Sequence, residues 1–476
     1  MKQGQTLFRY LHDALVMQIV SGKLAYGERI PSLRSLCGIY QVGIRTVRDV
    51  TDALMKEGYI ESVQRSHMQV SYQAGGNARE QAERILAKQD SMCSLFKTLA
   101  YIIPHIYAEA AVYCDMQMLK DSRKKSGNSL QRITSVYNNS LLQDLCIDME
   151  LFLQVTDIPG FANPYKDLAV KEANMLQKLY DSMECRNYQA IYDAINHFYL
   201  AGADALDKYF LSLHAAYPDL APEKVPYSWD AKKGRVRTYM QVTRSLLKNI
   251  LYGVYKDGTY LPPNAQLCKE YNISAYTVGK VMEELSRIGV IKQVKLRGGY
   301  LITCENAKAK GLSITNSTPR ADALTYLSAL HLIALMSKGL ALLGFDNLDN
   351  EKIAELTEKA EHMDALKLAP GIIAMMIQCQ TFQPLKAIYS QLINLLDWGF
   401  YFAFSFNDKP HVPTIRKYNL LMLSCIKAHD KNAFADVVQR NYYYIFGMMR
   451  DTLYEMGVTE AQNIKLPTHF LDEQPF

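Results

Sequence analysis

Three arginines near the start of the chain have side chains that can recognise a nucleic acid. They are Arg34, Arg45 and Arg48. A guanidinium group presents a planar fork of donors that matches a phosphate group or the O6 and N7 acceptors of a guanine base. It reaches a base edge from an element slim enough to enter the major groove, such as an α-helix. This chemistry therefore requires short, exposed helices around the arginines.

Two short helices joined by a tight turn are predicted at these positions. The Pro-Ser pair at 31–32 ends an extended segment, and the serine hydroxyl can cap a helix that ends near Tyr40. Gly43 then starts a second helix. This helix has a buried stripe at helical spacing, formed by Val47, Val50 and Leu54. Arg45 and Arg48 turn away from the stripe, which is the arrangement of a helix-turn-helix that reads DNA.

A further helix and a two-stranded wing complete a module of this kind. An amphipathic helix precedes the pair, with apolar residues at Leu7, Leu11, Leu15 and Ile19. Gly58 ends the second helix of the pair, and the segment from Tyr59 to Ser71 is predicted to form two short strands. The alternative for the same residues is a helical hairpin with a solvated basic face.

The whole segment resembles the winged helix-turn-helix of the GntR family of bacterial transcription regulators. The matches occur in order without a gap: Gly-Glu-Arg-Ile-Pro-Ser at 27–32, Arg34, Leu36, Val42, Thr-Val-Arg at 46–48, Leu54, Gly58 and Ile60. Gly43-Ile44 stands where the family usually has Ser-Arg, and the wing tip at 64–67 lacks the usual glycines. The resemblance implies that DNA is contacted by Ser32, Arg34, Arg45, Thr46, Arg48, Arg65 and His67.

The organisation of the first half returns in the second half at a constant shift of 231 residues. The shift takes Gly27 to Gly258, Pro31 to Pro262, Tyr40 to Tyr271, Thr46-Val47 to Thr277-Val278 and Gly58 to Gly289. The predicted fold is therefore mostly α, a tandem duplication of a winged helix-turn-helix plus an all-helical bundle. The predicted domains are a winged helix at 1–73, a helical bundle at 78–217, a proline-containing linker at 218–231, a degenerate winged helix at 232–304 and a second bundle at 318–476.

The second winged helix has fewer arginines on its reading helices but more positive charge. Ala265, Tyr276 and Gly279 stand at the positions of the three arginines. Residues 232–303 contain thirteen Lys and Arg against four Asp and Glu, whereas residues 1–72 contain nine against six. Phosphate contacts set affinity and base contacts set sequence, so we expect the first module to read bases and the second to hold the backbone.

DNA contacts in the second module are predicted at Ser274, Thr277, Lys280, Lys295 and Arg297. The alternative is a module that has lost DNA binding and serves for dimerisation or packing. Either way, the two modules of one chain are not expected to make identical contacts.

Both helical segments resemble the FadR C-terminal type of bundle, which in many GntR regulators binds a small effector. The first contains Asp148 and Asn163-Pro164, and His197 lies at another family position. Metal-binding members use one Asp and three His, but Phe152 replaces one of those His here. Two ligands do not hold a divalent ion against water, so neither a metal nor a cofactor is predicted. The Tyr- and Met-rich helices could line an effector pocket or form a plain apolar core.

Length, composition and motifs exclude several other classes of protein. At 476 residues the chain needs more than one core, and its 49% hydrophobic and 21% charged residues are typical of a soluble globular protein. Nine cysteines without a Cys-x-x-Cys pair favour a reducing cytoplasm. The most apolar run, at 329–345, contains His331 and Lys338 and is predicted to be a buried helix. The chain lacks the short motifs of nucleotide-binding, metallopeptidase and serine-nucleophile enzymes.

The predicted function is that of a cytoplasmic, DNA-binding transcription regulator rather than an enzyme. Its expected partners are a double-stranded DNA operator and a small-molecule effector in the bundles, without a membrane. One chain could fold as its own pseudo-dimer, or two chains could form a homodimer. The alternative function is a scaffold or a non-specific nucleic-acid-binding protein with degenerate winged helices.

Overall fold

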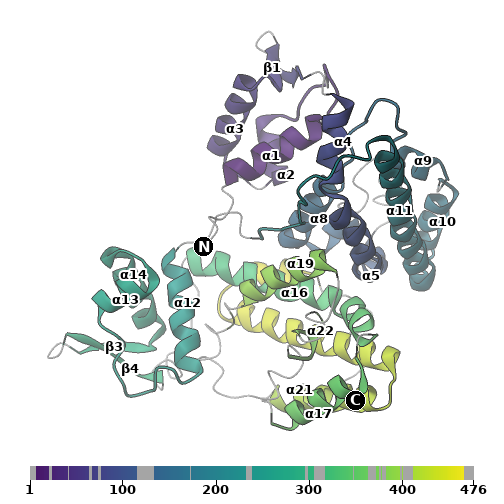
Figure 1. Ribbon diagram of the computed structural model, residues 1–476. Coiled ribbons are helices and arrows are strands. Elements are labelled where there is room, and N and C mark those ends of the chain that lie inside the picture. Colours follow the sequence, from purple (N-terminus) through teal and green to yellow (C-terminus); the bar gives the residue numbers. More distant parts are fainter. Residues whose placement is uncertain are drawn as a thin grey trace.

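Across the described residues the fold is mostly α-helical, with two antiparallel sheets of two strands each (Figure 1). The predicted fold class is therefore confirmed. In Figure 1 the two winged-helix modules lie at separate corners of the molecule, beside the helical segments. The computed structural model describes residues 7–20, 24–40, 42–63, 67–72, 77–114, 133–171, 173–231, 238–294, 298–304, 317–346, 348–362, 371–374, 377, 382–396, 399 and 411–465.

The first winged-helix module consists of α1 (Leu7–Val20), α2 (Leu33–Tyr40), α3 (Ile44–Lys56), β1 (Ile60–Val63) and β2 (His67–Val70). Helix α1 packs against α3, and their facing residues recur at helical spacing: Leu11, Leu15, Ile19, Val47, Val50 and Leu54. Gly58 follows α3 with a φ of +79°, a conformation in which glycine ends a helix without strain. The predicted helices, buried stripe and wing are all present.

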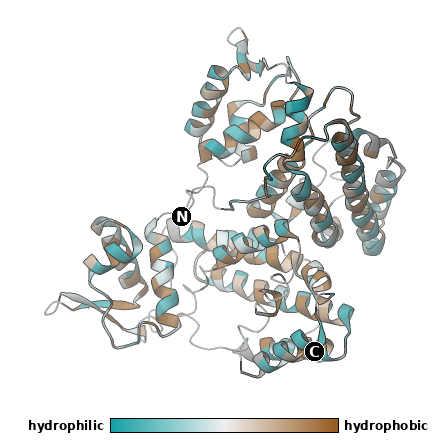
Figure 2. Cartoon of the chain, in the orientation of Figure 1, coloured by the Kyte–Doolittle hydropathy of each residue, from teal (hydrophilic) through white to brown (hydrophobic). Residues whose placement is uncertain are grey.

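The second module repeats the first, element by element. It consists of α12 (Thr238–Leu251), α13 (Asn264–Tyr271), α14 (Ala275–Ile288), β3 (Ile291–Val294) and β4 (Gly299–Ile302). The 231-residue shift carries α1, α2 and β1 onto α12, α13 and β3 with the same bounds. Ile60 pairs with Val70 whereas Ile291 pairs with Ile302, so the second wing is one residue longer. Figure 2 shows that the helices of both modules have hydrophobic and hydrophilic sides.

Helices also fill both segments that follow the winged helices. The first segment holds α4 (Ala78–Leu86), α5 (Gln89–Tyr113), η1 (Ser135–Tyr137), α8 (Ser140–Phe152), α9 (Pro164–Lys171), α10 (Ala173–Glu184) and α11 (Tyr188–Ala216). The second holds α16 (Ser317–Phe345), α17 (Asn350–His362), α19 (Gln383–Leu396), α21 (Val412–Lys427), α22 (Lys431–Glu455) and η3 (Thr459–Asn463). Pro159 and Gly160, a pair of residue types that favours a turn, lie between α8 and α9.

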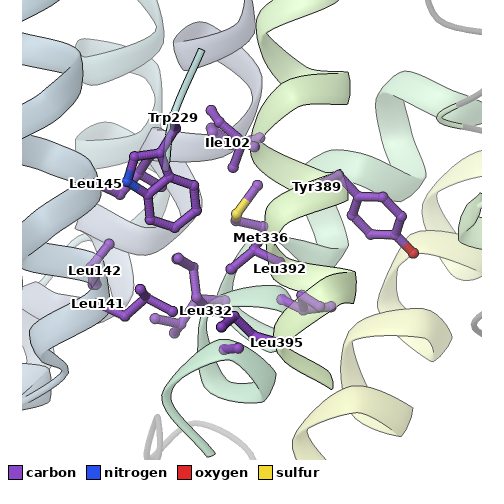
Figure 3. Packing of buried hydrophobic residues seen from close by; sticks show 14 of the residues in the cluster. Ile102, Leu141, Leu142, Leu145, Trp229, Leu332, Met336, Tyr389, Leu392 and Leu395 are labelled. Atoms are coloured by element: carbon purple, nitrogen blue, oxygen red, sulfur yellow. The ribbon is translucent and has the colours of Figure 1, made fainter. Parts of the chain in front are cut away.

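The two helical segments pack on each other through a pair of helices related by the duplication. The 231-residue shift takes α5 to residues 320–344, which lie within α16, and α5 contacts α16. At their crossing, a Cβ atom added to Gly339 would lie 2.3 Å from the carbonyl oxygen of Tyr101. Side chains from both halves meet in one apolar core (Figure 3). The core thus crosses the domain boundary that the sequence suggests between the segments.

Helix α16 contains the most apolar stretch of the described chain. Residues Arg320–Phe345 are long and apolar enough to cross a membrane, but 89% of the apolar window is buried inside the protein. The burial comes from neighbouring helices, since α16 contacts α5, α8, α19 and α22. The helix is therefore a core helix, as predicted.

A buried asparagine joins the two halves at the start of α8. The Asn139 side-chain oxygen accepts hydrogen bonds from the backbone N–H groups that begin this helix. Its Nδ2 donates to the Ser328 carbonyl oxygen at 2.9 Å and lies 3.1 Å from His331 Nδ1, both on α16. Burial lowers the pKa of His331 to about 3, so the ring is neutral and Nδ1 can accept. One amide group thus caps a helix and binds the opposite half.

A buried glutamate makes a second polar contact between the halves. Glu109 on α5 accepts hydrogen bonds from Gln439, at 2.8 Å, and from the Tyr443 hydroxyl, both on α22. Burial raises the pKa of Glu109 to about 8, although these hydrogen bonds and the charge of Lys338 act in the opposite direction. The folded protein therefore favours the neutral carboxyl group.

Residues 218–231, the predicted linker, lack helix and strand but are fastened to the first half; we call them the strap. The Tyr227 hydroxyl donates to the Asp148 carboxylate on α8 at 3.0 Å. Tyr227 and Trp229 are both buried, and Figure 3 shows Trp229 against Leu145 in the shared core. The strap is thus part of the packed structure rather than a free connection.

Gly339→Ala is expected to destabilise the protein by about 1–3 kcal/mol, because the added methyl group must push the backbone of α5 away. The matched control is Gly279→Ala on α14, where an added Cβ meets nothing within 4 Å. That change should stabilise the protein by roughly 0.5–1 kcal/mol, because alanine favours a helix more than glycine does. Urea unfolding measures the free energy of unfolding of both variants. If both substitutions stabilised the protein, or both destabilised it, the close crossing of α5 and α16 would be contradicted.

Glu109→Gln is expected to make the protein's stability less dependent on pH. Because folding raises the Glu109 pKa from 4.5 to about 8, its contribution is complete below pH 4.5 and is lost as the pH rises through about 8. Wild type should therefore lose up to several kcal/mol relative to Glu109→Gln across this window. Thermal midpoints across that pH range measure the difference. Glu455→Gln, at the exposed end of α22, is the control and should show the same pH dependence as wild type. If the difference in thermal midpoint between wild type and Glu109→Gln did not change with pH, the neutral carboxyl group would be refuted.

Candidate nucleic-acid interface

The exposed face of α3 is the candidate DNA-reading surface of the first module. Val47, Val50 and Leu54 are fully buried, which fixes how the helix is rotated about its axis. Arg45 and Arg48 consequently project from the opposite face and are exposed. Both lie in the first half of α3, the end that helix-turn-helix proteins insert into the major groove.

Helix α2 adds the third arginine. Arg34 is exposed in the first turn of α2. The Ser32 hydroxyl accepts a hydrogen bond from the Ser35 N–H at 3.2 Å, so the predicted cap of this helix is present. Thr46 is half-buried on α3. Because α2 packs against α3, the three arginines come from two helices held in one unit.

The described part of the first wing contributes less positive charge than the helices do. His67 is half-buried at the start of β2, where it pairs with Val63 of β1. Across the same strands, Gln69 donates to the exposed carboxylate of Glu61 at 2.8 Å. A carboxylate repels a phosphate group, so this face favours DNA less than α2 and α3 do. The predicted contact Arg65 lies outside the described residues.

The predicted contacts of the second module are divided between a helix cap and an exposed lysine. The Ser274 hydroxyl caps α14, accepting from the Thr277 N–H at 3.2 Å and lying 2.9 Å from the Thr277 hydroxyl. This helix therefore begins with a serine cap, as α2 does. Lys280 is exposed further along α14. Lys295 and Arg297 lie outside the described residues.

An exposed tyrosine occupies the position on α14 that Arg45 holds on α3. Tyr276 is 75% exposed. Lys280 Nζ lies 5.3 Å from the centroid of the Tyr276 ring and 5.9 Å from that of Tyr239 on α12. These distances allow cation–π attraction. The sequence shows Tyr276 only as the replacement of an arginine. The 231-residue shift places it at the position of Arg45 and so on the exposed face of the second helix of the pair.

The helical segments show no assembled metal site within the described ranges. No group of three or more His, Cys, Asp or Glu side chains there is placed to hold an ion. Asp148 is half-buried on α8, where desolvation raises its pKa to about 7 and Tyr227 donates to its carboxylate. His197 is exposed on α11. In this structure the carboxylate of Asp148 thus fastens the strap to α8.

Comparison with known proteins adds an independent observation. The family model described as "Bacterial regulatory proteins, gntR family" matches residues 9–70 and 238–301. Over 63 residues the chain is 33% identical to a "Probable fructoselysine utilization operon transcriptional repressor" of Escherichia coli (strain K12), and to a protein of the same description from Shigella flexneri. The match covers 13% of this chain and 26% of the repressor, so it spans about one winged-helix module.

Two solved structures are also similar to parts of the chain. "Streptococcus agalactiae GntR" is 15% identical with a TM-score of 0.21, covering 41% of this chain and 99% of that one. "E. coli McbR/YncC" is 15% identical with a TM-score of 0.19, covering 46% and 99% respectively. With TM-scores this low, neither structure indicates how the domains of this chain are arranged. The two family-model matches, however, coincide with the two modules that the structure presents. The chain therefore contains two modules that match the model of the gntR family of bacterial regulatory proteins, one at residues 9–70 and a second at 238–301.

Proposed function

We propose that this protein is a sequence-specific, DNA-binding transcription regulator whose first winged helix reads most of the operator. The observation that carries the proposal is the exposure of Arg45 and Arg48 on one face of α3. Each guanidinium can donate two hydrogen bonds to a guanine, which contributes about 1–3 kcal/mol of discrimination. Arg34 lies on the preceding helix, where it can bind the DNA backbone beside the groove.

The second module holds DNA mainly through phosphate groups. Ala265 and Gly279 replace two of the arginines, yet residues 232–303 contain thirteen basic against four acidic residues. Exposed lysines such as Lys280 and Lys292 supply part of this charge. Phosphate contacts raise the affinity for every duplex and are weakened by salt. This module therefore adds affinity and orientation more than sequence choice.

One chain supplies both DNA-binding modules of a complete unit. Two-fold operators are usually bound by homodimers, whose symmetry sets the spacing of the half-sites. Here α5 packs on α16, its counterpart under the duplication, so the halves of one chain contact each other as two subunits would. The operator is consequently asymmetric, with one strongly specified half and one tolerant half.

Gating by a small-molecule effector, which the family resemblance implies, and a cytoplasmic location, which the cysteine usage favours, stay predictions. The described helices of both segments contribute to a continuous apolar core, and the strap is fastened to α8. Neither observation requires an effector. The alternative function is a scaffold or a non-specific nucleic-acid binder, which the experiment below distinguishes from a sequence-specific regulator.

Selection from a random duplex library is expected to enrich a motif. Arg45→Ala or Arg48→Ala should then lower affinity for that duplex roughly 10-fold or more, with little effect on scrambled DNA, because a base contact is lost. Lys292→Ala and Lys295→Ala should weaken both duplexes alike and lower the salt slope by about one unit per lost phosphate contact. Fluorescence anisotropy titrations at several salt concentrations measure these effects.

Arg9→Ala is the matched control for the loss of one charge, since Arg9 is exposed on α1 and pairs with Asp13. It should leave the affinity for both duplexes nearly unchanged. The absence of any enriched motif would support the scaffold instead. The roles of the modules would be reversed if the lysine variants lost affinity only for the matched duplex while the arginine variants lost affinity for both duplexes alike.

One chain is expected to bind one operator. Light scattering of the free protein and of the complex gives the number of chains, and a nuclease footprint gives the length and symmetry of the site. Because the two reading faces differ, protection should cover two unlike half-sites. Two chains on a perfect palindrome would contradict the internal pseudo-dimer.

A further inference from the structure

A single aromatic residue stands out on the reading face of the second module. Tyr276 lies in the first turn of α14, beside the Ser274 cap, and is 75% exposed. The buried residues of α14 turn this side of the helix outward; they are Val278, Val281, Met282, Leu285 and Ile288. At Gly279, further along the exposed side, a Cβ atom would meet nothing within 4 Å. The tyrosine ring is therefore open to an incoming partner.

The chemistry of a tyrosine at this position favours one base over the other three. In the major groove, guanine is matched by a fork of donors, adenine by a side-chain amide and cytosine by an acceptor. Thymine is the base that presents a methyl group, and apolar surface is what matches it. Beside that methyl group lies the O4 acceptor, to which a hydroxyl can donate. The Tyr276 side chain offers both an apolar ring and a hydroxyl.

Lys280 restrains the ring before any DNA arrives. Its Nζ lies 5.3 Å from the Tyr276 centroid and 5.9 Å from the Tyr239 centroid. A ring held in place loses less conformational freedom on binding, and the ammonium group can still pair with a phosphate. In the first module the position of Lys280 is occupied by Asp49, so this arrangement is specific to the second.

We propose that Tyr276 is a specificity-determining residue that selects a thymine in the half-site bound by the second module. Lys280 is its positioning residue, holding the ring and pairing with a neighbouring phosphate. The proposal rests on the proposed function, since it needs an operator. It gives the second module one base contact in addition to its phosphate contacts.

The test removes the thymine methyl group and the tyrosine ring separately. In the enriched duplex, each thymine of the tolerant half-site is replaced in turn by deoxyuridine, which lacks only the 5-methyl group. Wild type is expected to lose about 3- to 10-fold in affinity at one position. Tyr276→Ala should bind weakly from the start and be insensitive to that replacement, whereas Tyr276→Phe, which keeps the ring, should stay sensitive.

A specificity exchange gives a gain-of-function readout. Tyr276→Arg introduces the residue that the first module has at this position and should change the preferred base there from thymine to guanine by roughly 10-fold. Tyr454→Ala, which removes an exposed tyrosine from α22, is the control and should change neither affinity nor preference.

The outcomes separate this inference from the proposed function. A deoxyuridine effect of equal size in wild type and Tyr276→Ala, or none at any position, would overturn the thymine contact while operator binding remained. Selection that enriches no motif would overturn the proposed function and the inference together. The contact would be supported if Tyr276→Ala lost the deoxyuridine effect while Tyr276→Phe kept it, and if the thermal midpoint of Tyr276→Ala were unchanged.

Discussion

The close crossing of α5 and α16 is the constraint on which the rest of the structure depends. Gly339 lacks a side chain, so the backbone of α16 approaches the Tyr101 carbonyl closely enough that no Cβ would fit. Around the crossing, Ile102, Leu332 and Met336 pack in one apolar core (Figure 3). Interiors packed this tightly tolerate little displacement. The two halves of the chain therefore form one body, and each winged-helix module is attached to that shared core rather than to an independent bundle.

Because the duplicated modules lie in one chain, the second helices of their helix pairs, α3 and α14, can differ in sequence. In a homodimer, every substitution in a recognition helix appears in both half-sites at once. In this chain α3 keeps Arg45 and Arg48, while α14, which begins at the equivalent position, has Tyr276 and Gly279 in their place. The buried stripe is retained in both helices, because losing it would unfold the module. Divergence has thus occurred on the exposed face, where it changes the side chains offered to a partner without altering the fold.

Helix α8 ties the first module to the shared core. On one side Asp148 accepts a hydrogen bond from Tyr227 of the strap. Elsewhere on the helix, Ile147 and Leu151 are half-buried against the apolar core of the first module. The second module is joined differently, since its buried residues are continuous with the main core of the helical segments. The first module therefore has a core of its own, and its orientation depends on the contact between α1 and α8.

The sequence by itself determined the two modules, their caps and their repetition, because these depend on patterns within a few turns of chain. The stripe at Val47, Val50 and Leu54, the Ser32 cap and the constant shift can all be recognised without knowing what lies nearby. The tertiary structure decided which helices meet. The approach of Gly339 to Tyr101 joins residues that are far apart in the chain, and the prolines of the strap do not reveal that Trp229 is buried. Such contacts depend on how long-range packing excludes water and fills space, and no local periodicity encodes that.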